Sequence, residues 1–242
     1  MKNITSLILA AGKGTRLNCT DRPKVMLMIG DKPMIEYQVK TMEDLGADRI
    51  ILVIGFRGDL IKDYLKDRVE YVEQKEQLGT GHAVMMAKEK IKDFDGYVLI
   101  APGDAPFLTL EMLNSLVTKC EGRDLDGCIL SVNLKDPLEY GRIVRDESNN
   151  VLRIVEKKDA TEEQLKIKEI NTGVYCFKAK ALLENLDLIS NNNVQKEYYL
   201  TDLIEIMNKK GLKLDTVITD DFEHTMGINR PEELERARQI VK

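Results

Sequence analysis

The stretch "LILAAGKGTRLNCTDRPK", residues 7–24, joins a short apolar run to a glycine-rich turn. The run is nearly continuous and stops at Gly12, as is typical of a strand covered on both faces of a parallel sheet. In open α/β sheets, ligands bind beyond the carboxyl ends of the strands. The turn is basic although the whole chain has a formal net charge of -5. We therefore expect the turn to bind an anion. Its basic residues are Lys13, Arg16, Arg22 and Lys24.

The first half of the chain alternates β-branched-rich runs with amphipathic stretches. The apolar runs cover residues 4–11, 50–55, 69–72, 97–101 and 127–132, and the helical patterns cover residues 33–45, 58–65, 81–91 and 109–119. Pro33 suits a first helical turn, and Thr109 suits an N-cap. This alternation predicts a Rossmann-like, doubly wound, mostly parallel mixed sheet.

The pattern changes after residue 132. A strand–turn–strand pattern around Asn149-Asn150 predicts an antiparallel hairpin, and "TEEQ" at 161–164 is a capping-box pattern. Helices near 182–186 and 200–209, a strand near 214–218 and a last helix from Pro231 follow. We expect one domain over residues 1–242, with a nucleotide-binding half at about 1–132. Residues 133–228 complete the sheet and form a smaller lobe, and residues 229–242 form the C-terminal helix.

Composition excludes several classes of protein. A pI of about 5.3 argues against a general nucleic-acid binder. No apolar run reaches the roughly 18–20 residues of a membrane span, and the N-terminus has no signal-peptide pattern. The four cysteines form no CxxC and no zinc spacing, so we expect unpaired thiols and a cytoplasmic protein. Oligomeric state is not readable from these patterns.

The opening turn matches neither of two common phosphate-binding motifs. A P-loop would need a glycine at the position of Leu9, and a dinucleotide-binding loop would need one at the position of Leu17. Gly12 and Gly14 still allow backbone N–H groups to approach an anion. Arg16 can add a fork-shaped donor and Lys24 a point charge. The alternative is a solvated turn with chance charges.

Two further segments carry polar residues at the ends of predicted elements. In "APGD", Asp104 follows a buried strand and a glycine, and in "MGINRPEEL", Asn229 precedes the last helix. A carboxylate and an amide oxygen suit Mg²⁺, which retains water and takes phosphate oxygens as further ligands. The alternatives are a turn aspartate and a helix N-cap. In "QLGTGHA", residues 77–83, the turn around Thr80 can offer backbone groups to a flat base, or is a plain helix entry with His82 in its first turn.

These motifs together resemble one known family. "GKGTR" at 12–16 followed by Pro23-Lys24 is similar to the signature of sugar-1-phosphate nucleotidylyltransferases. "QLGTGHA", "YGRI" at 140–143, "IVEKKDA" at 154–160, "EINTGVY" at 169–175 and "EYYLTD" at 197–202 occur in the order of its N-acetylglucosamine-1-phosphate uridylyltransferase branch. The resemblance extends from about residue 4 to 235. It implies a Mg²⁺-dependent enzyme that uses a nucleoside triphosphate and a sugar-1-phosphate to make a cell-envelope precursor.

The resemblance also implies a role for each matching residue. Catalytic contacts to phosphate would come from Arg16 and Lys24, and metal ligands from Asp104 and Asn229. The nucleotide site would comprise Leu9, Ala10, Ala11, Gly12, Gly14, Gln74, Gly79, Thr80 and Gly103. The sugar site, in the smaller lobe, would comprise Gly141, Glu156, Asn171, Tyr199 and Thr201.

Two departures from the family pattern bear on specificity. Pro102 stands where that branch has Tyr before Gly-Asp, and no hexapeptide repeat of an acetyltransferase β-helix follows. We therefore expect no acetyltransferase activity from these residues. Two alternatives to this function remain. The first is the same reaction with another sugar-1-phosphate such as that of glucose, or with another nucleotide such as CTP or dTTP. The second is a nucleotide-sugar sensor without catalysis.

Overall fold

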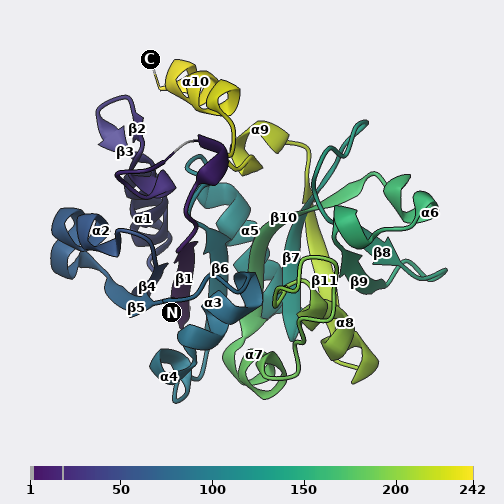
Figure 1. Cartoon of the computed structure of the whole chain (residues 1–242). Helices are drawn as coiled ribbons and strands as arrows, with labels where there is room; N and C mark the ends of the chain where they lie inside the picture. Colours follow the sequence, from purple (N-terminus) through teal and green to yellow (C-terminus); the bar gives the residue numbers. More distant parts are fainter. Residues whose placement is uncertain (1–2, 18, 242) are drawn as a thin grey trace.

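The computed structural model describes residues 3–17 and 19–241, so the ends of the predicted domain, residues 1–2 and 242, lie outside it. In the described ranges, a nine-stranded mixed sheet forms the centre of the molecule (Figure 1). Its main path is β11-β7-β10-β6-β1-β4-β5, and β8 and β9 extend from β10. Along this path β10 alone runs antiparallel to its neighbours. The predicted mostly parallel, Rossmann-like sheet is therefore confirmed.

The elements of the first part of the chain follow the predicted alternation. They are β1 (Ile4–Ala10), β2 (Met28–Ile29), β3 (Lys32–Pro33), α1 (Met34–Leu45), β4 (Arg49–Ile54), α2 (Gly58–Leu65), β5 (Glu70–Glu73), α3 (Thr80–Met86), α4 (Lys88–Ile91), β6 (Tyr97–Pro102), α5 (Leu110–Gly122) and β7 (Gly127–Asn133). Short 3-10 turns occupy Thr15–Leu17, Lys24–Met26 and Lys66–Arg68.

The second part forms the smaller lobe, returns to the sheet and ends in a helix. Its elements are β8 (Arg142–Arg145), β9 (Val151–Val155), a 3-10 turn (Lys157–Asp159), α6 (Glu162–Leu165), β10 (Glu169–Lys178), α7 (Ala179–Leu186), α8 (Asp202–Lys209), β11 (Leu214–Thr219), α9 (Phe222–Thr225) and α10 (Pro231–Ile240). The predicted hairpin is β8–β9, and the capping box of Thr161 and Gln164 is present.

Three predictions about local structure need correction. The helix expected over 81–91 is two helices, α3 and α4, with Ala87 between them. Pro33 closes the β2–β3 hairpin and precedes α1 as its N-cap, so it lies outside the first helical turn. The ten-residue strand β10 has no counterpart among the predicted elements. The N-cap prediction for Thr109 is confirmed, because its side chain accepts from Met112 N.

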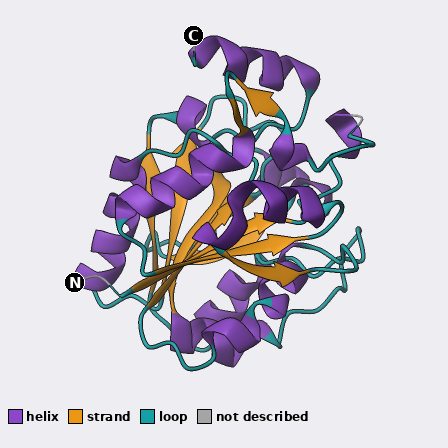
Figure 2. Cartoon of the chain, turned by 90° about the vertical axis from the view of Figure 1, so that its left-hand side faces the viewer, coloured by secondary structure: helices purple, strands orange, loops and turns teal. Residues whose placement is uncertain are grey.

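Helices cover both faces of the sheet (Figure 2). One buried cluster joins the sheet to α1, α2 and α5, and a second joins it to α3, α4, α7 and α8. Burial on both faces explains why β1 and β4 are almost wholly apolar. No helix in the described part of the chain is long and apolar enough to cross a membrane.

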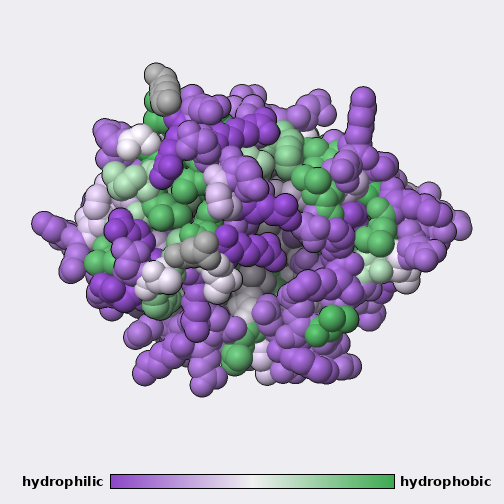
Figure 3. Space-filling model, turned by 45° about the horizontal axis from the view of Figure 1, so that its top comes forward, coloured by the Kyte–Doolittle hydropathy of each residue, from purple (hydrophilic) through white to green (hydrophobic). Residues whose placement is uncertain are grey.

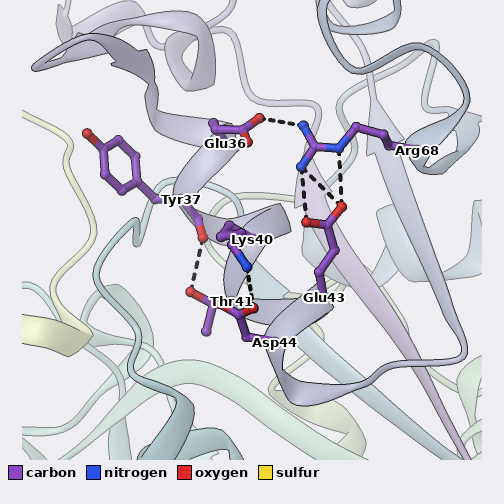
Figure 4. Close-up of polar contacts among 7 residues, drawn as sticks. All are labelled: Glu36, Tyr37, Lys40, Thr41, Glu43, Asp44 and Arg68. Carbon is purple, nitrogen blue, oxygen red and sulfur yellow. Dashed lines mark hydrogen bonds and ion pairs between the residues drawn. The ribbon is translucent and has the colours of Figure 1, made fainter.

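The outer surface of α1 carries a set of paired charges (Figure 4). Arg68 donates to Glu36 at 2.8 Å and to Glu43 at 3.1 Å, which ties the segment after α2 to α1. Lys40 pairs with Asp44 one turn further along the same helix. Each of these charges has a partner of opposite sign.

Candidate functional site

A cleft of about 910 Å³ opens at the carboxyl ends of β1 and β6 and reaches the smaller lobe. Figure 3 shows a hollow near the centre of that face, surrounded largely by hydrophilic residues. Fifteen of the eighteen site residues predicted from the sequence line the cleft. These are Leu9, Ala11, Gly12, Gly14, Arg16, Lys24, Gln74, Gly79, Thr80, Asp104, Gly141, Glu156, Asn171, Thr201 and Asn229.

The opening turn is folded so that Lys24 faces the cleft. Gly14 adopts a φ of 68°, a left-handed conformation that favours glycine. A Cβ at Gly14 would lie 2.8 Å from Lys24 Cβ, so the turn and Lys24 approach each other closely only because position 14 has no side chain. Arg16 also lines the cleft, whereas Arg22 pairs with Asp21 on the surface. The turn thus directs two of its four basic residues to the cleft.

Three polar side chains from distant segments meet beside this turn. Lys24 Nζ contacts the carboxylate of Asp104 and donates to Asn229 Oδ1 at 2.9 Å. The side chains of Lys24 and Asp104 are 13% and 20% exposed, so the pair is largely shielded from water. Ile228 N donates to the Asp104 carbonyl oxygen at 2.8 Å and so ties the two metal-ligand candidates together.

Asn229 does not cap the last helix. The carboxylate of Glu233 accepts from the backbone N–H of Asn229 at 2.6 Å and of Arg230 at 3.0 Å. This carboxylate takes the capping role, so the amide oxygen of Asn229 faces Lys24 instead. In the described residues, no group of three or more His, Cys, Asp or Glu side chains could hold a metal ion. The Asp104–Asn229 pair is thus a two-ligand arrangement.

The end of the cleft around Gln74 and Thr80 is fixed by close packing. Gln74 is buried, and its Nε2 donates to the Gly79 carbonyl oxygen at 3.1 Å and lies 3.0 Å from His82 Nδ1. Gly79 has a φ of 111°, and a Cβ there would lie 2.5 Å from Tyr198 O. Thr80 Oγ1 accepts from Leu200 N at 3.1 Å. His82 lies in the first turn of α3, as predicted.

The smaller lobe contributes a buried polar cluster. Thr201 Oγ1 donates to Glu156 Oε1 at 3.1 Å, and Asn171 Nδ2 donates to Tyr175 OH at 2.7 Å. Burial raises the pKa of the Glu156 carboxyl, and the hydrogen bond from Thr201 works against that rise. Burial likewise raises the pKa of Tyr175, which therefore stays protonated and able to donate. Such a cluster offers donors and acceptors to a polar ligand.

The other three predicted residues lie outside the cleft lining. Ala10 is buried, and Gly103 N donates to the Leu9 carbonyl oxygen at 2.9 Å behind the opening turn. Tyr199 is 7% exposed and its hydroxyl is buried, so the structure does not bring it to the ligand space. Burial raises the pKa of Tyr199 to about 12.

Several lining residues were not singled out from the sequence. They include Gln77, Tyr140, Tyr175, Glu197, Arg230 and Glu233. All lie in or next to the quoted motifs, and this position in the sequence is the feature that could have identified them. Pro102 lines the cleft opposite Gly173, where a Cβ would lie 3.7 Å from Pro102 Cγ.

Comparison with known proteins places this cleft in a family. A family model described as nucleotidyl transferase matches residues 5–223. The chain is 42% identical over 241 residues to the bifunctional protein GlmU of Enterococcus faecalis (strain ATCC 700802 / V583), covering 100% of this chain and 52% of that protein. It is 43% identical over 237 residues to the bifunctional protein GlmU of Geobacillus sp. (strain WCH70), covering 98% and 51%. The chain thus spans about half the length of these curated relatives.

The fold is also shared with a solved structure. UDP-glucose pyrophosphorylase complexed with UDP-glucose superimposes with a TM-score of 0.80 at 19% identity, covering 100% of this chain and 98% of that one. This likeness shows the fold, and the family match covers most of the cleft-lining residues. On the strength of that match, this chain belongs to the nucleotidyl transferase family.

Proposed function

We propose that the cleft transfers a uridylyl group from UTP to N-acetylglucosamine-1-phosphate and releases pyrophosphate. The observation that carries the proposal is the junction of three features in one cleft. The basic turn with the Lys24–Asp104–Asn229 cluster, the Gln74–Thr80 segment and the polar cluster of the lobe all line it. The 42% identity to GlmU supports the choice of substrates.

The proposed roles follow from chemistry and position. The Gln74, Gly79 and Thr80 segment faces the uracil, with Leu9, Ala11, Gly12 and Gly14 along the nucleotide. Glu156, Asn171, Thr201 and Gly141 contact the sugar, which keeps the division into a nucleotide-binding half and a sugar-binding lobe. Tyr199, Ala10 and Gly103 have no direct contact with substrate in this proposal.

The reaction needs charge neutralisation more than proton transfer. An oxygen of the sugar phosphate forms a bond to the α-phosphorus of UTP, and the bond from that phosphorus to the bridging oxygen of the β-phosphate breaks. The attacking oxygen is already anionic, so no general base is required. Positioning and electrostatic stabilisation therefore supply the rate. Arg16 and Lys24 bind phosphate oxygens and stabilise the charge that moves to pyrophosphate.

Asp104 and Asn229 fit a divalent cation, and nucleotidyl transferases typically use one. The carboxylate and the amide oxygen converge on one point, which the ammonium of Lys24 takes here. Two oxygen donors with room for phosphate oxygens suit Mg²⁺. When bound, Mg²⁺ offsets phosphate charge as a Lewis acid. With Mg²⁺ on these two oxygens, we expect the Lys24 ammonium to bind a phosphate oxygen instead.

A second candidate is the same reaction with a different sugar or nucleotide. Pro102 favours this candidate, because its side chain lines the cleft near Gly173. A proline there gives the cleft a different shape from the Tyr that the resembling branch has at this position. A sensor without catalysis is less well supported, since the cations and both metal-ligand candidates are all present. The free thiols of Cys19, Cys120, Cys128 and Cys176, together with these substrates, support a cytoplasmic location.

A pyrophosphate-release assay with Mg²⁺ tests the proposal. It crosses UTP, CTP, dTTP, ATP and GTP with the 1-phosphates of N-acetylglucosamine, glucose and N-acetylgalactosamine. We expect the highest kcat/KM for UTP with N-acetylglucosamine-1-phosphate. Preference for another pair would support the second candidate, and no release with any pair would leave the sensor.

A further inference from the structure

Arg16 and Arg230 differ from the other arginines of this chain. Nine of the others pair with carboxylates, and Arg142 donates to backbone carbonyl oxygens. Within residues 3–17 and 19–241, the guanidinium groups of Arg16 and Arg230 have no ion-pair partner and no hydrogen-bond acceptor. Both line the same cleft. Unpaired guanidinium groups in a cleft are available to bind an anion.

The backbone at Arg230 is held firmly although the side chain is exposed. Glu233 accepts from the N–H groups of Asn229 and Arg230, and Leu234 N donates to the Arg230 carbonyl oxygen at 3.1 Å. Arg230 therefore starts at a fixed point, directly after the residue that accepts from Lys24. Its long side chain is free to turn toward a ligand.

Arg16 and Arg230 share the cleft with a carboxylate of the lobe, Glu139. Glu139, on the loop before β8, lines the cleft and pairs with Lys157 at 2.5 Å. That ion pair lowers the pKa of the Glu139 carboxyl, and the charges of Arg230 and Arg16 lower it further. The two guanidinium groups thus belong to one cleft but come from separate segments, the opening turn and the residue before α10.

We propose that Arg230 binds the pyrophosphoryl group together with Arg16, first as the β- and γ-phosphates of the nucleotide and then as released pyrophosphate. The inference rests on the proposed function and adds a residue to it. A pyrophosphoryl group carries more charge than the single phosphate of the sugar, and its many oxygens suit two planar, fork-shaped donors. Arg16 comes from the predicted nucleotide-binding turn, which assigns this pair to the nucleotide side.

The test uses the reverse reaction, in which pyrophosphate and UDP-N-acetylglucosamine are the substrates. We expect Arg230→Gln to raise KM for pyrophosphate about tenfold or more, the effect of losing a charge-assisted hydrogen bond, with KM for the UDP-sugar within about twofold of wild type. Arg230→Lys keeps the charge but not the fork, so its KM should be intermediate. Arg236→Gln is the matched control, because Arg236 lies on the same helix and pairs with Glu223 at 2.7 Å.

An unchanged KM for pyrophosphate in Arg230→Gln would overturn the inference, as would a rise confined to the UDP-sugar. If the wild-type protein lacks the reverse reaction, the proposed function fails separately. Calorimetric titration with sodium pyrophosphate and Mg²⁺ then decides the inference alone. Binding at least about tenfold weaker in Arg230→Gln than in Arg236→Gln supports it, and equal binding contradicts it.

Discussion

The outer surface of α1 and the cleft use their arginines in opposite ways. On α1, Arg68 is shared by two carboxylates and Lys40 has Asp44 (Figure 4). In the cleft, Arg16 and Arg230 have no such partners among the described residues. Exposed ion pairs contribute roughly 0–1 kcal/mol to stability. The comparison teaches that the paired arginine joins elements of this fold, while the unpaired arginines are available to a substrate.

The largest effect should come from Asp104. Asp104→Asn removes the only carboxylate of the Lys24–Asp104–Asn229 cluster. We expect kcat/KM to fall by about 10³-fold or more, at the upper end of what one electrostatic contact supplies. Calorimetry with Mn²⁺ should show weaker metal binding in the variant. Asp44→Asn, in the paired set on α1, is the matched control and should keep both activity and metal binding. Full activity of Asp104→Asn would show that this cluster has no role in catalysis.

Lys24→Met should have the next largest effect. Its ammonium contacts both metal-ligand candidates, and in the proposed reaction it binds phosphate instead. We expect kcat/KM to fall by roughly 10²-fold, about 2.7 kcal/mol of transition-state stabilisation. Lys40→Met is the control on α1. Steady-state kinetics within about threefold of wild type for Lys24→Met would contradict its proposed role.

A smaller effect concerns pH and stability at the edge of the lobe. Burial, and repulsion from Glu205, raise the pKa of Asp202 from 3.8 to about 6. Between pH 4 and 6 the folded protein therefore keeps a proton that the unfolded chain has lost, and the free energy of unfolding falls as pH rises. The shift corresponds to about 3 kcal/mol at most. Solvent screening of this half-buried carboxyl and the favourable position of a carboxylate at the start of α8 both reduce that figure.

Asp202→Asn should therefore be about 1–2 kcal/mol more stable than wild type at pH 8 and of nearly equal stability at pH 4. Urea unfolding at the two pH values measures the difference. If Asp202→Asn and wild type had the same stability at both pH values, the Asp202 carboxyl would titrate as it does in water.

The parallel part of the fold was predictable because its signal is local. Runs such as Ile4–Ala10 are buried on both faces and read as apolar. β10 was missed because "EINTGVYCFK" mixes polar residues into the run, and its pairing with β7 shifts register between Asn171 and Tyr175. The buried Asn171 donates to Tyr175 of the same strand, and the buried Thr172 donates to the Leu130 carbonyl oxygen of β7. A periodic pattern cannot reveal these contacts.

The candidate site likewise contains residues that the sequence identified and residues that it did not. Residues inside the quoted motifs, such as Gly14 and Asp104, were predictable because short spacing and resemblance identify them. Arg230 was not, because a sequence gives its charge but not whether a carboxylate lies beside it. Tyr199 was placed in the sugar site by its motif, whereas its side chain is packed into the interior. Pairing and side-chain direction are properties of the tertiary structure.

The most direct test of this comparison substitutes one arginine from each region. For Arg16→Gln and Arg68→Gln, kcat/KM in pyrophosphate release and the free energy of unfolding in urea are measured together. We predict that Arg16→Gln loses roughly 10²-fold in kcat/KM with unchanged stability. Arg68→Gln should keep its kcat/KM and lose about 1 kcal/mol or less of stability. If Arg16→Gln kept full kcat/KM, or the two variants lost it equally, the distinction between paired and unpaired charge would be contradicted.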